Sequence, residues 1–209
     1  MTAPTPLDIL NSYILPGGTD KVDAFSEIAN PNERYIVYFE YYFDFGEGAA
    51  ADRQSDFLLP GESRPVARLG IDAAQFPGTP NLMLENVRWK RVPAHQITDV
   101  LAWQAERLDF LVENFNFSLI GEGGLGANAL RFTLKNNTPY GYKNPLFYLG
   151  LYQSGGLVGI MRFDLTDFES LESREIDLRN FTQNLSVSEI KLFPVIDLYD
   201  KAVYLPPKK

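Results

Sequence analysis

Alternating hydrophobic and polar positions dominate the chain and predict β-strands. In residues 129–136 (ALRFTLKN), Leu130, Phe132 and Leu134 alternate with charged or polar residues. This period of two is typical of a sheet with one face in the core and the other in water. Three further segments show a similar strand-forming pattern: 35–45 (YIVYFEYYFDF), 145–156 (PLFYLGLYQSGG) and 188–199 (SEIKLFPVIDLY).

Turn signals separate these predicted strands. They are NPN at 30–32, GEG at 46–48, PGES at 60–63, NNTPYG at 136–141 and SGG at 154–156. Short strands with such regular punctuation indicate a β-sandwich or barrel. In FLLPGESR (57–64), Pro60 presets φ and Gly61 supplies the positive φ that follows. We therefore expect this segment to be a turn between two extended segments.

One segment departs from the strand pattern. TDVLAWQAERL (98–108) contains good helix formers, with Thr98 or Asp99 as a possible N-cap. We expect a short helical turn around 98–105. A strand should follow it, through the apolar residues Phe110, Val112, Phe115, Phe117 and Leu119.

The two halves of the chain resemble each other. When residues 12–30 are compared without a gap to 118–136, a shift of 106, Asn30 meets Asn136 and Ile28 meets Leu134. The same comparison pairs Ser12 with Ser118, Ile14 with Ile120, and Gly17 and Gly18 with Gly123 and Gly124. Later matches need other shifts: Phe39, Tyr41 and Phe43 with Phe147, Leu149 and Leu151 at 108, Glu62 and Ser63 with Glu172 and Ser173 at 110, and Leu84, Val87 and Arg88 with Val187, Ile190 and Lys191 at 103. Chance identity is the alternative, but the preserved strand order favours duplication.

A duplication predicts an all-β protein of two tandem β-sandwiches, residues 8–94 and 105–204, with the short helical turn in or near the linker. FLLPGESR then joins the fourth and fifth strands of the first unit. FESLESRE (168–175) fills the same place in the second unit, without the Pro-Gly pair. Each unit is about the size of one sandwich domain, and domains this small bury a limited share of their surface. The two units are therefore expected to lean on each other.

The strand and turn motifs resemble the FxLYD-type immunoglobulin-like domain of bacterial envelope proteins. The first unit supplies IANPN (28–32), FEYYFDFGEG (39–48) and LLPGES (58–63), and the second LKNNT (134–138), FYLGLYQSGGLVG (147–159) and LESRE (171–175). The chain also resembles tandem ectodomains that follow an N-terminal membrane helix. The resemblance implies two immunoglobulin-like sandwiches, an extracytoplasmic location at the cell envelope or surface, and no catalysis. The sequence departs from the FxLYD pattern after Tyr152, where Gln153 stands in place of the Asp.

The amino-acid composition limits the classes of partner and chemistry that are open to this chain. The chain has 209 residues, a net charge of −8 and 13% aromatic residues. The electric field of this negative net charge repels the phosphate backbone of a nucleic acid, so we expect no nucleic acid partner. The chain has no cysteine, which excludes disulfides, thiolate metal sites and thiol catalysis. No apolar run is long enough to cross a bilayer and no signal peptide is evident, so any membrane attachment is expected to come from a segment outside this chain. The Pro- and Thr-rich start, MTAPTPLDI, is expected to be a tether.

Few residues offer reactive chemistry. His95 is the only histidine and lies in a polar link, so we expect a solvated residue rather than a catalytic one. Four acids near 164–172 are candidates for a calcium site but lack the EF-hand spacing: Asp164, Asp167, Glu169 and Glu172. The glycines of GEGGLGAN (121–128) precede a strand pattern, so we expect a hairpin loop and not a phosphate-binding loop. We predict no catalytic residue, no metal and no cofactor.

Aromatic residues are the best candidates for an interaction surface. Rings occupy both faces of the strand at 35–45, so one face must be core and the other is available for packing between the units or for a partner. The candidate surface residues are Tyr38, Tyr42, Trp103, Tyr140 and Tyr142. We expect a structural or protein-interaction module with a protein partner in the envelope. The alternative is a carbohydrate- or small-molecule-binding module at the cleft between the units, ringed by Trp103, Tyr140 and Tyr142.

Overall fold

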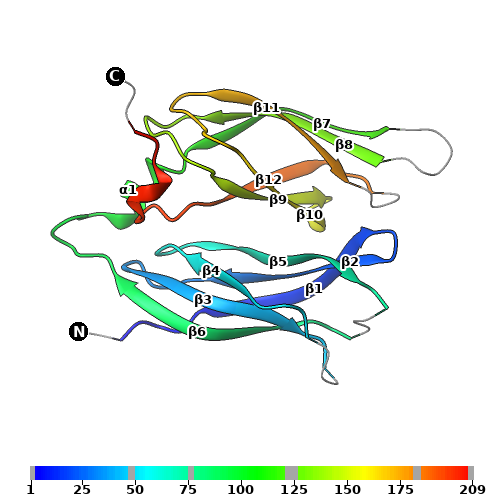
Figure 1. Ribbon diagram of the computed structural model, residues 1–209, viewed down its shortest axis with the longest axis horizontal. Coiled ribbons are helices and arrows are strands. Elements are labelled where there is room, and N and C mark those ends of the chain that lie inside the picture. Colours follow the sequence, from blue (N-terminus) through cyan, green and yellow to red (C-terminus); the bar gives the residue numbers. More distant parts are fainter. Residues whose placement is uncertain (1–2, 47–49, 75–77, 121–126, 181–184, 207–209) are drawn as a thin grey trace. The chain divides into compact units, whose positions relative to one another are not determined.

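The chain divides into two compact units, Met1–Trp103 (unit 1) and Gln104–Lys209 (unit 2) (Figure 1). The computed structural model describes residues 3–46, 50–74, 78–120, 127–180 and 185–206. Each unit is a β-sandwich of two three-stranded antiparallel sheets. The prediction of an all-β chain with two sandwiches is therefore confirmed.

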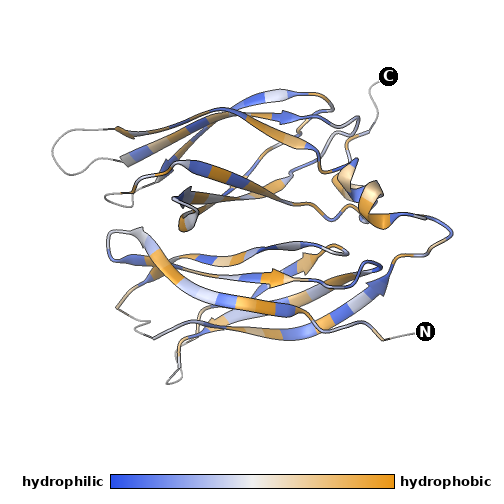
Figure 2. Cartoon of the chain, turned by 180° about the vertical axis from the view of Figure 1, so that it is seen from behind, coloured by the Kyte–Doolittle hydropathy of each residue, from blue (hydrophilic) through white to orange (hydrophobic). Residues whose placement is uncertain are grey.

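In unit 1, one sheet has the order β1-β2-β5 and the other β4-β3-β6. The first contains β1 (Asp8–Gly18), β2 (Lys21–Ala29) and β5 (Ser63–Asp72). The second contains β4 (Gln54–Leu58), β3 (Tyr35–Asp44) and β6 (Asn81–Arg91). The core between them is built from the alternate positions of the strands, including Ile28, Val37, Phe39, Tyr41, Phe43, Leu58 and Val66. Figure 2 shows this alternation of hydropathy along the strands.

Unit 2 repeats this topology, with sheet orders β7-β8-β11 and β10-β9-β12. The first sheet contains β7 (Phe110–Ile120), β8 (Ala127–Asn136) and β11 (Ser173–Asn180). The second contains β10 (Gly156–Asp164), β9 (Leu146–Gln153) and β12 (Glu189–Val195). Its core includes Leu130, Phe132, Leu134, Phe147, Leu149, Leu151 and Phe168. The matched triplets of the central strands β3 and β9 are core residues in both units.

The predicted helical turn is α1 (Val100–Ala105). Asp99 caps it, because its carboxylate accepts a hydrogen bond of 3.0 Å from the Ala102 N–H. A short 3₁₀ helix, η1 (Lys201–Val203), lies near the C-terminus. Among the described residues, no helix combines the length and the apolar character that a membrane crossing requires.

The strand pairings correct two parts of the internal alignment. Ala29 pairs with Asp8 and Lys135 pairs with Leu111, so the first strands match at a shift of 103 and not 106. The reason is that the connection between β7 and β8 is longer than the one between β1 and β2, which an ungapped comparison cannot accommodate. The proposed glycine matches at 123 and 124 lie outside the described residues.

The last strands were also misaligned. Arg88 pairs with Tyr38, and Val195 pairs with Leu146, the residue 108 positions after Tyr38. Val195 therefore corresponds to Arg88, so the proposed match of Arg88 with Lys191 was wrong. Strand β6 contains a register shift between the partners of Tyr38 and Glu40, whereas β12 pairs with β9 without one.

The N-terminal segment is held against unit 1, where the sequence suggested a tether. The Thr5 N–H donates to Asn32 Oδ1 over 2.8 Å, and Asn32 Nδ2 donates to the Thr5 carbonyl over 2.7 Å. Asn32 is the last residue of the NPN turn. This pair of bonds explains why the segment before β1 follows the body of the unit.

Candidate functional site

The five aromatic residues proposed as a surface are divided between the two units, and one of them is buried. Tyr38 and Tyr42 are half-buried on β3, on the face opposite to the core residues of that strand. Tyr38 packs 6.2 Å from the ring of Phe57, and the Arg53 guanidinium lies 4.9 Å over the ring of Tyr42. Trp103 is half-buried on α1, at the end of unit 1.

Tyr142 was wrongly assigned to the surface, because it is fully buried in unit 2. Its hydroxyl donates to the Arg107 carbonyl, and its ring lies 5.6 Å from that of Phe110. Burial raises the pKa of the Tyr142 phenol far above its usual range. Tyr140 is half-buried and lies under the Arg107 guanidinium, 4.3 Å from its carbon. The alternating pattern around these residues gave no sign that the loop before β9 turns inward.

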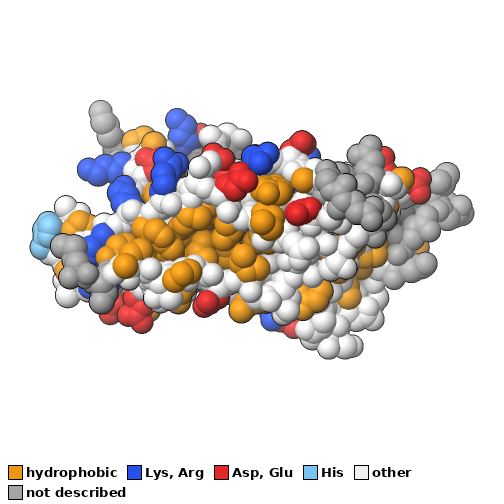
Figure 3. All heavy atoms as spheres, turned by 90° about the horizontal axis from the view of Figure 1, so that it is seen from below, with side chains coloured by type: hydrophobic (Ala, Val, Ile, Leu, Met, Phe, Trp, Pro, Cys, Tyr) orange, Lys and Arg blue, Asp and Glu red, His pale blue; other side chains and the backbone are white. Residues whose placement is uncertain are grey.

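A better candidate is an apolar groove at the open edge of unit 1, where the edge strands β1 and β6 of the two sheets lie next to each other. The groove has a volume of about 310 Å³ and is lined by Pro4, Pro6, Leu7, Leu84, Val87 and Trp89. We call this set the open-edge groove. Figure 3 shows apolar side chains gathered on this face of unit 1.

The side chains at this edge are unusually exposed for their type. Ile9 of β1 is 42% exposed and Val87 of β6 is 41% exposed. Ile9 lies opposite the core residue Ile28 and therefore points to the inner side of its sheet. Trp89 lies opposite the core residue Val37 and points inward from the other sheet. The edge of the core is thus open to solvent between β1 and β6.

Basic residues lie next to the groove residues along β6. Arg88, Lys90 and Arg91 are exposed and follow one another around Trp89. They are three of the eight Lys and Arg residues in positions 1–103, a stretch that also has 14 Asp and Glu. In the part of the chain that the structure describes, none of the three forms an ion pair. The sequence signal was the string NVRWKR (86–91), in which no interaction residue was predicted.

The corresponding edge of unit 2 differs. Phe110, Val112 and Phe115 of β7 are partly buried and pack on the core of that unit. In β12, Pro194 has no main-chain N–H to donate to a neighbouring strand. Lys191 Nζ lies 4.5 Å over the centre of the Tyr152 ring. Two units with one topology therefore carry different edges.

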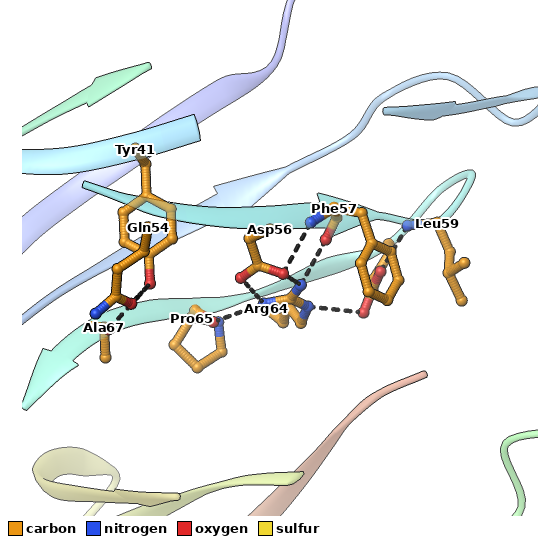
Figure 4. A network of polar contacts seen from close by, with 9 residues as sticks. Tyr41, Gln54, Asp56, Phe57, Leu59, Arg64, Pro65 and Ala67 are labelled. Carbon is orange, nitrogen blue, oxygen red and sulfur yellow. Dashed lines mark hydrogen bonds and ion pairs between the residues drawn. The ribbon is translucent and has the colours of Figure 1, made fainter. Parts of the chain in front are cut away.

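The FLLPGESR segment forms a buried ionic network and not a site (Figure 4). It joins β4 to β5, as predicted. The Arg64 side chain is 1% exposed, and its Nη2 lies 2.6 Å from Asp56 Oδ1. Arg64 Nε lies 3.2 Å from Glu62 Oε1, and the other Glu62 oxygen accepts a bond of 2.7 Å from the Leu59 N–H. Burial raises the pKa of Glu62, and the Arg64 guanidinium opposes that shift.

Unit 2 repeats this network in a more exposed form. Arg174 Nη2 lies 2.6 Å from Glu172 Oε1, and Glu172 Oε2 accepts a bond of 2.7 Å from the Glu169 N–H. Arg174 also donates to the carbonyls of Thr166 and Asp167. The Arg174 side chain is 29% exposed. These acids were the calcium candidates, and Glu172 is instead engaged with a cation of its own chain.

The remaining candidates for chemistry are dispersed. His95 is exposed in the connection before α1, as expected for a solvated residue. Among the residues that the structure describes, no three His, Cys, Asp or Glu side chains gather closely enough to hold a metal ion. The glycine-rich loop at 121–126 lies outside the described residues.

Comparisons with known proteins yield no family. No family model matches the chain, and no curated protein matches it. A similar solved structure is the crystal structure of red sea bream transglutaminase, with 10% identity and a TM-score of 0.26. The match covers 93% of this chain and 29% of that chain. At this TM-score the similarity carries no argument about fold or activity.

Proposed function

We propose that this chain is a non-catalytic module of a bacterial cell envelope and that it recognises a protein partner through the open-edge groove of unit 1. The envelope location follows from the FxLYD-type resemblance of the turns and strands. The observation that carries the binding role is the groove itself, an apolar hollow that the core of unit 1 leaves uncovered on an edge strand that also carries basic residues.

Physical chemistry supports a binding role for this edge. Removing apolar surface from water is favourable by about 25 cal/mol per Å². A partner that covers exposed side chains such as Ile9 and Val87 therefore gains binding free energy. A contiguous apolar patch with a polar rim is the usual character of a protein interface. The charged groups that are buried elsewhere in unit 1, Arg64 above all, already have partners inside the fold.

The test is a capture experiment with the intact chain immobilised and an envelope extract of the source bacterium. We expect the chain to retain at least one protein. The double variant Ile9→Thr, Val87→Thr makes the edge polar at two exposed positions and should reduce retention at least tenfold.

The matched control lies on the equivalent edge strand of unit 2. Leu111 and Leu119 are 44% and 72% exposed, and Leu111→Thr, Leu119→Thr makes the same kind of change there. This control should retain the partner like the unchanged chain. Retention of a polysaccharide instead of a protein, or equal losses in both double variants, would overturn the proposal.

A further inference from the structure

We infer that β6 binds an extended segment of a partner protein that adds to its free edge as a further strand and that alternates apolar and acidic side chains. This inference rests on the proposed function and states the chemistry of the partner. Three features of β6 carry it: an available edge, a two-faced side-chain pattern, and basic side chains that form no ion pair among the described residues.

The available edge is the part of β6 that follows its irregularity. Among the described strands β6 pairs with β3 alone, so none of them is hydrogen-bonded to its second edge. Asn86 has a φ of 51°, and the register shift of the β3–β6 ladder lies next to it. After that point the pairing is regular from Tyr38 with Arg88 to Tyr35 with Arg91. An added strand gains main-chain hydrogen bonds along such an edge.

The side chains of this stretch point to two different environments. Trp89 faces inward beside the groove, as its pairing with Val37 requires. Val87, two residues earlier, lines the same groove. Arg88 and Lys90 alternate with them and therefore point to the opposite face of the sheet.

This alternation sets the pattern of the bound segment. Residues that lie opposite each other on paired strands share a face and contact each other. On the groove side, the added strand places apolar side chains against Val87 and Trp89. On the other side, it places side chains beside Arg88 and Lys90, where acidic groups are favoured and basic ones repelled.

The same charges argue against a second copy of this chain at β6. Two β6 strands side by side would bring their Arg88 and Lys90 side chains together, and like charges on neighbouring strands are destabilising. Basic residues on an edge strand thus block self-pairing while they leave the edge open to an acidic strand. In unit 2, β12 has Pro194 within the strand and no such basic run, so we expect no equivalent binding there.

The test uses three capped eight-residue peptides and the intact chain labelled with nitrogen-15. The first alternates valine and glutamate, the second alternates valine and lysine, and the third has four valines followed by four glutamates. We expect the first to shift the amide resonances of 87–91 and to bind at least tenfold more tightly than the other two. Binding should weaken as salt rises.

Two charge-reversal variants separate the binding edge from net charge. Arg88→Glu, Lys90→Glu should weaken binding of the valine–glutamate peptide at least tenfold and restore binding of the valine–lysine peptide. Lys143→Glu, Lys201→Glu changes two exposed lysines of unit 2 by the same charge and should leave affinity within twofold. Circular dichroism checks that both variants remain folded.

The outcomes distinguish this inference from the proposed function. If Ile9→Thr, Val87→Thr loses the captured partner but Arg88→Glu, Lys90→Glu retains it, the inference fails and the proposed function stands. Equal binding of the block peptide contradicts strand addition. A concentration-dependent dimer that Arg88→Glu, Lys90→Glu abolishes contradicts the choice of a foreign strand over a second copy.

Discussion

Replacement of Arg64 by methionine tests the interpretation of the FLLPGESR turn as a buried ionic network. Methionine keeps much of the length of the side chain and removes the guanidinium. Asp56 and Glu62 then lose the cation that compensates them, at side-chain exposures of 8% and 17%. Breaking a buried pair by removing one partner costs about 3–5 kcal/mol, since the remaining charge stays buried.

Unit 2 supplies the internal control, Arg174→Met. Arg174 and Glu172 are 29% and 25% exposed, so water replaces the lost cation there. We expect a cost of about 1 kcal/mol, as for ion pairs near the surface. The comparison isolates the effect of burial, because the two arginines hold the same position in the two units.

Urea unfolding followed by tryptophan fluorescence reports on unit 1, since both tryptophans of the chain, Trp89 and Trp103, belong to it. With a dependence of about 1–3 kcal/mol per molar urea, a loss of 3 kcal/mol lowers the midpoint by about 1 M or more. Arg174→Met should leave this fluorescence transition unchanged. Equal shifts in both variants, or a loss below about 1 kcal/mol for Arg64→Met, would refute the reasoning.

Acid should partly rescue Arg64→Met. Burial raises the pKa of Glu62 in the native state, and removal of the guanidinium takes away the group that opposes this shift. The native state then binds a proton more readily than the unfolded state, so stability increases as pH falls. A stability deficit of Arg64→Met that is the same at pH 7 and pH 4 would contradict a carboxylate origin.

Three further predictions concern stability. Burial raises the pKa of Asp23 to about 6, so the ionised carboxyl destabilises unit 1 above about pH 6, and this cost disappears as pH falls toward 3.8. Asp23→Asn should therefore stabilise unit 1 by up to about 3 kcal/mol at pH 7 and flatten the pH dependence of its stability. Urea unfolding measures both effects. Leu171 has a φ of 58° and is 63% exposed, so Leu171→Gly should raise the stability of the protein by up to about 1 kcal/mol. Gly61→Ala should lower the stability, because Gly61 has a φ of 68° and a Cβ there would lie 2.9 Å from a side-chain carbon. Thermal unfolding checks both variants. Asn30→Ala and Asn136→Ala each remove two donors to main-chain carbonyls and should cost about 2–3 kcal/mol, but only the first should move the tryptophan transition.

The repeated polar corner explains why the similarity of the two halves was visible in the sequence. Asn30 and Asn136 donate from their main-chain N–H groups to the carbonyls of Glu62 and Glu172, with 2.8 Å in both units. Each side-chain amide then holds two further carbonyls, a task that other side chains perform poorly. Residues with such a specific hydrogen-bonding task keep their identity, so they align. Core residues need only size and apolarity, and Tyr41 is matched by Leu149.

The left-handed turn position shows a limit of this reasoning. FESLESRE was predicted to fill the same place in unit 2 although it lacks the Pro-Gly pair. The structure keeps the backbone, with Leu171 at the positive φ that Gly61 adopts in unit 1. The Glu169 N–H donates to Glu172 Oε2 and the Glu172 N–H donates to the Glu169 carbonyl; these bonds hold the turn, so the surrounding contacts override the preference for glycine.

The candidate site was the least predictable part. The alternation of hydrophobic and polar residues identified the strands, but it does not distinguish an exposed aromatic ring from a buried one. Tyr142 was therefore placed on the surface although the core encloses it. The groove depends on which strands end each sheet, and therefore on pairings between residues far apart in the chain. Pro4 and Trp89 line one hollow across 85 positions of sequence.

Local pattern thus specified the elements, their order and the twofold plan, because period, turn chemistry and capping are properties of neighbouring residues. The open edge, its basic residues and the burial of single side chains depend on long-range pairing. Solvent exposure is a property of the assembled sheets, so no stretch of residues contains it alone.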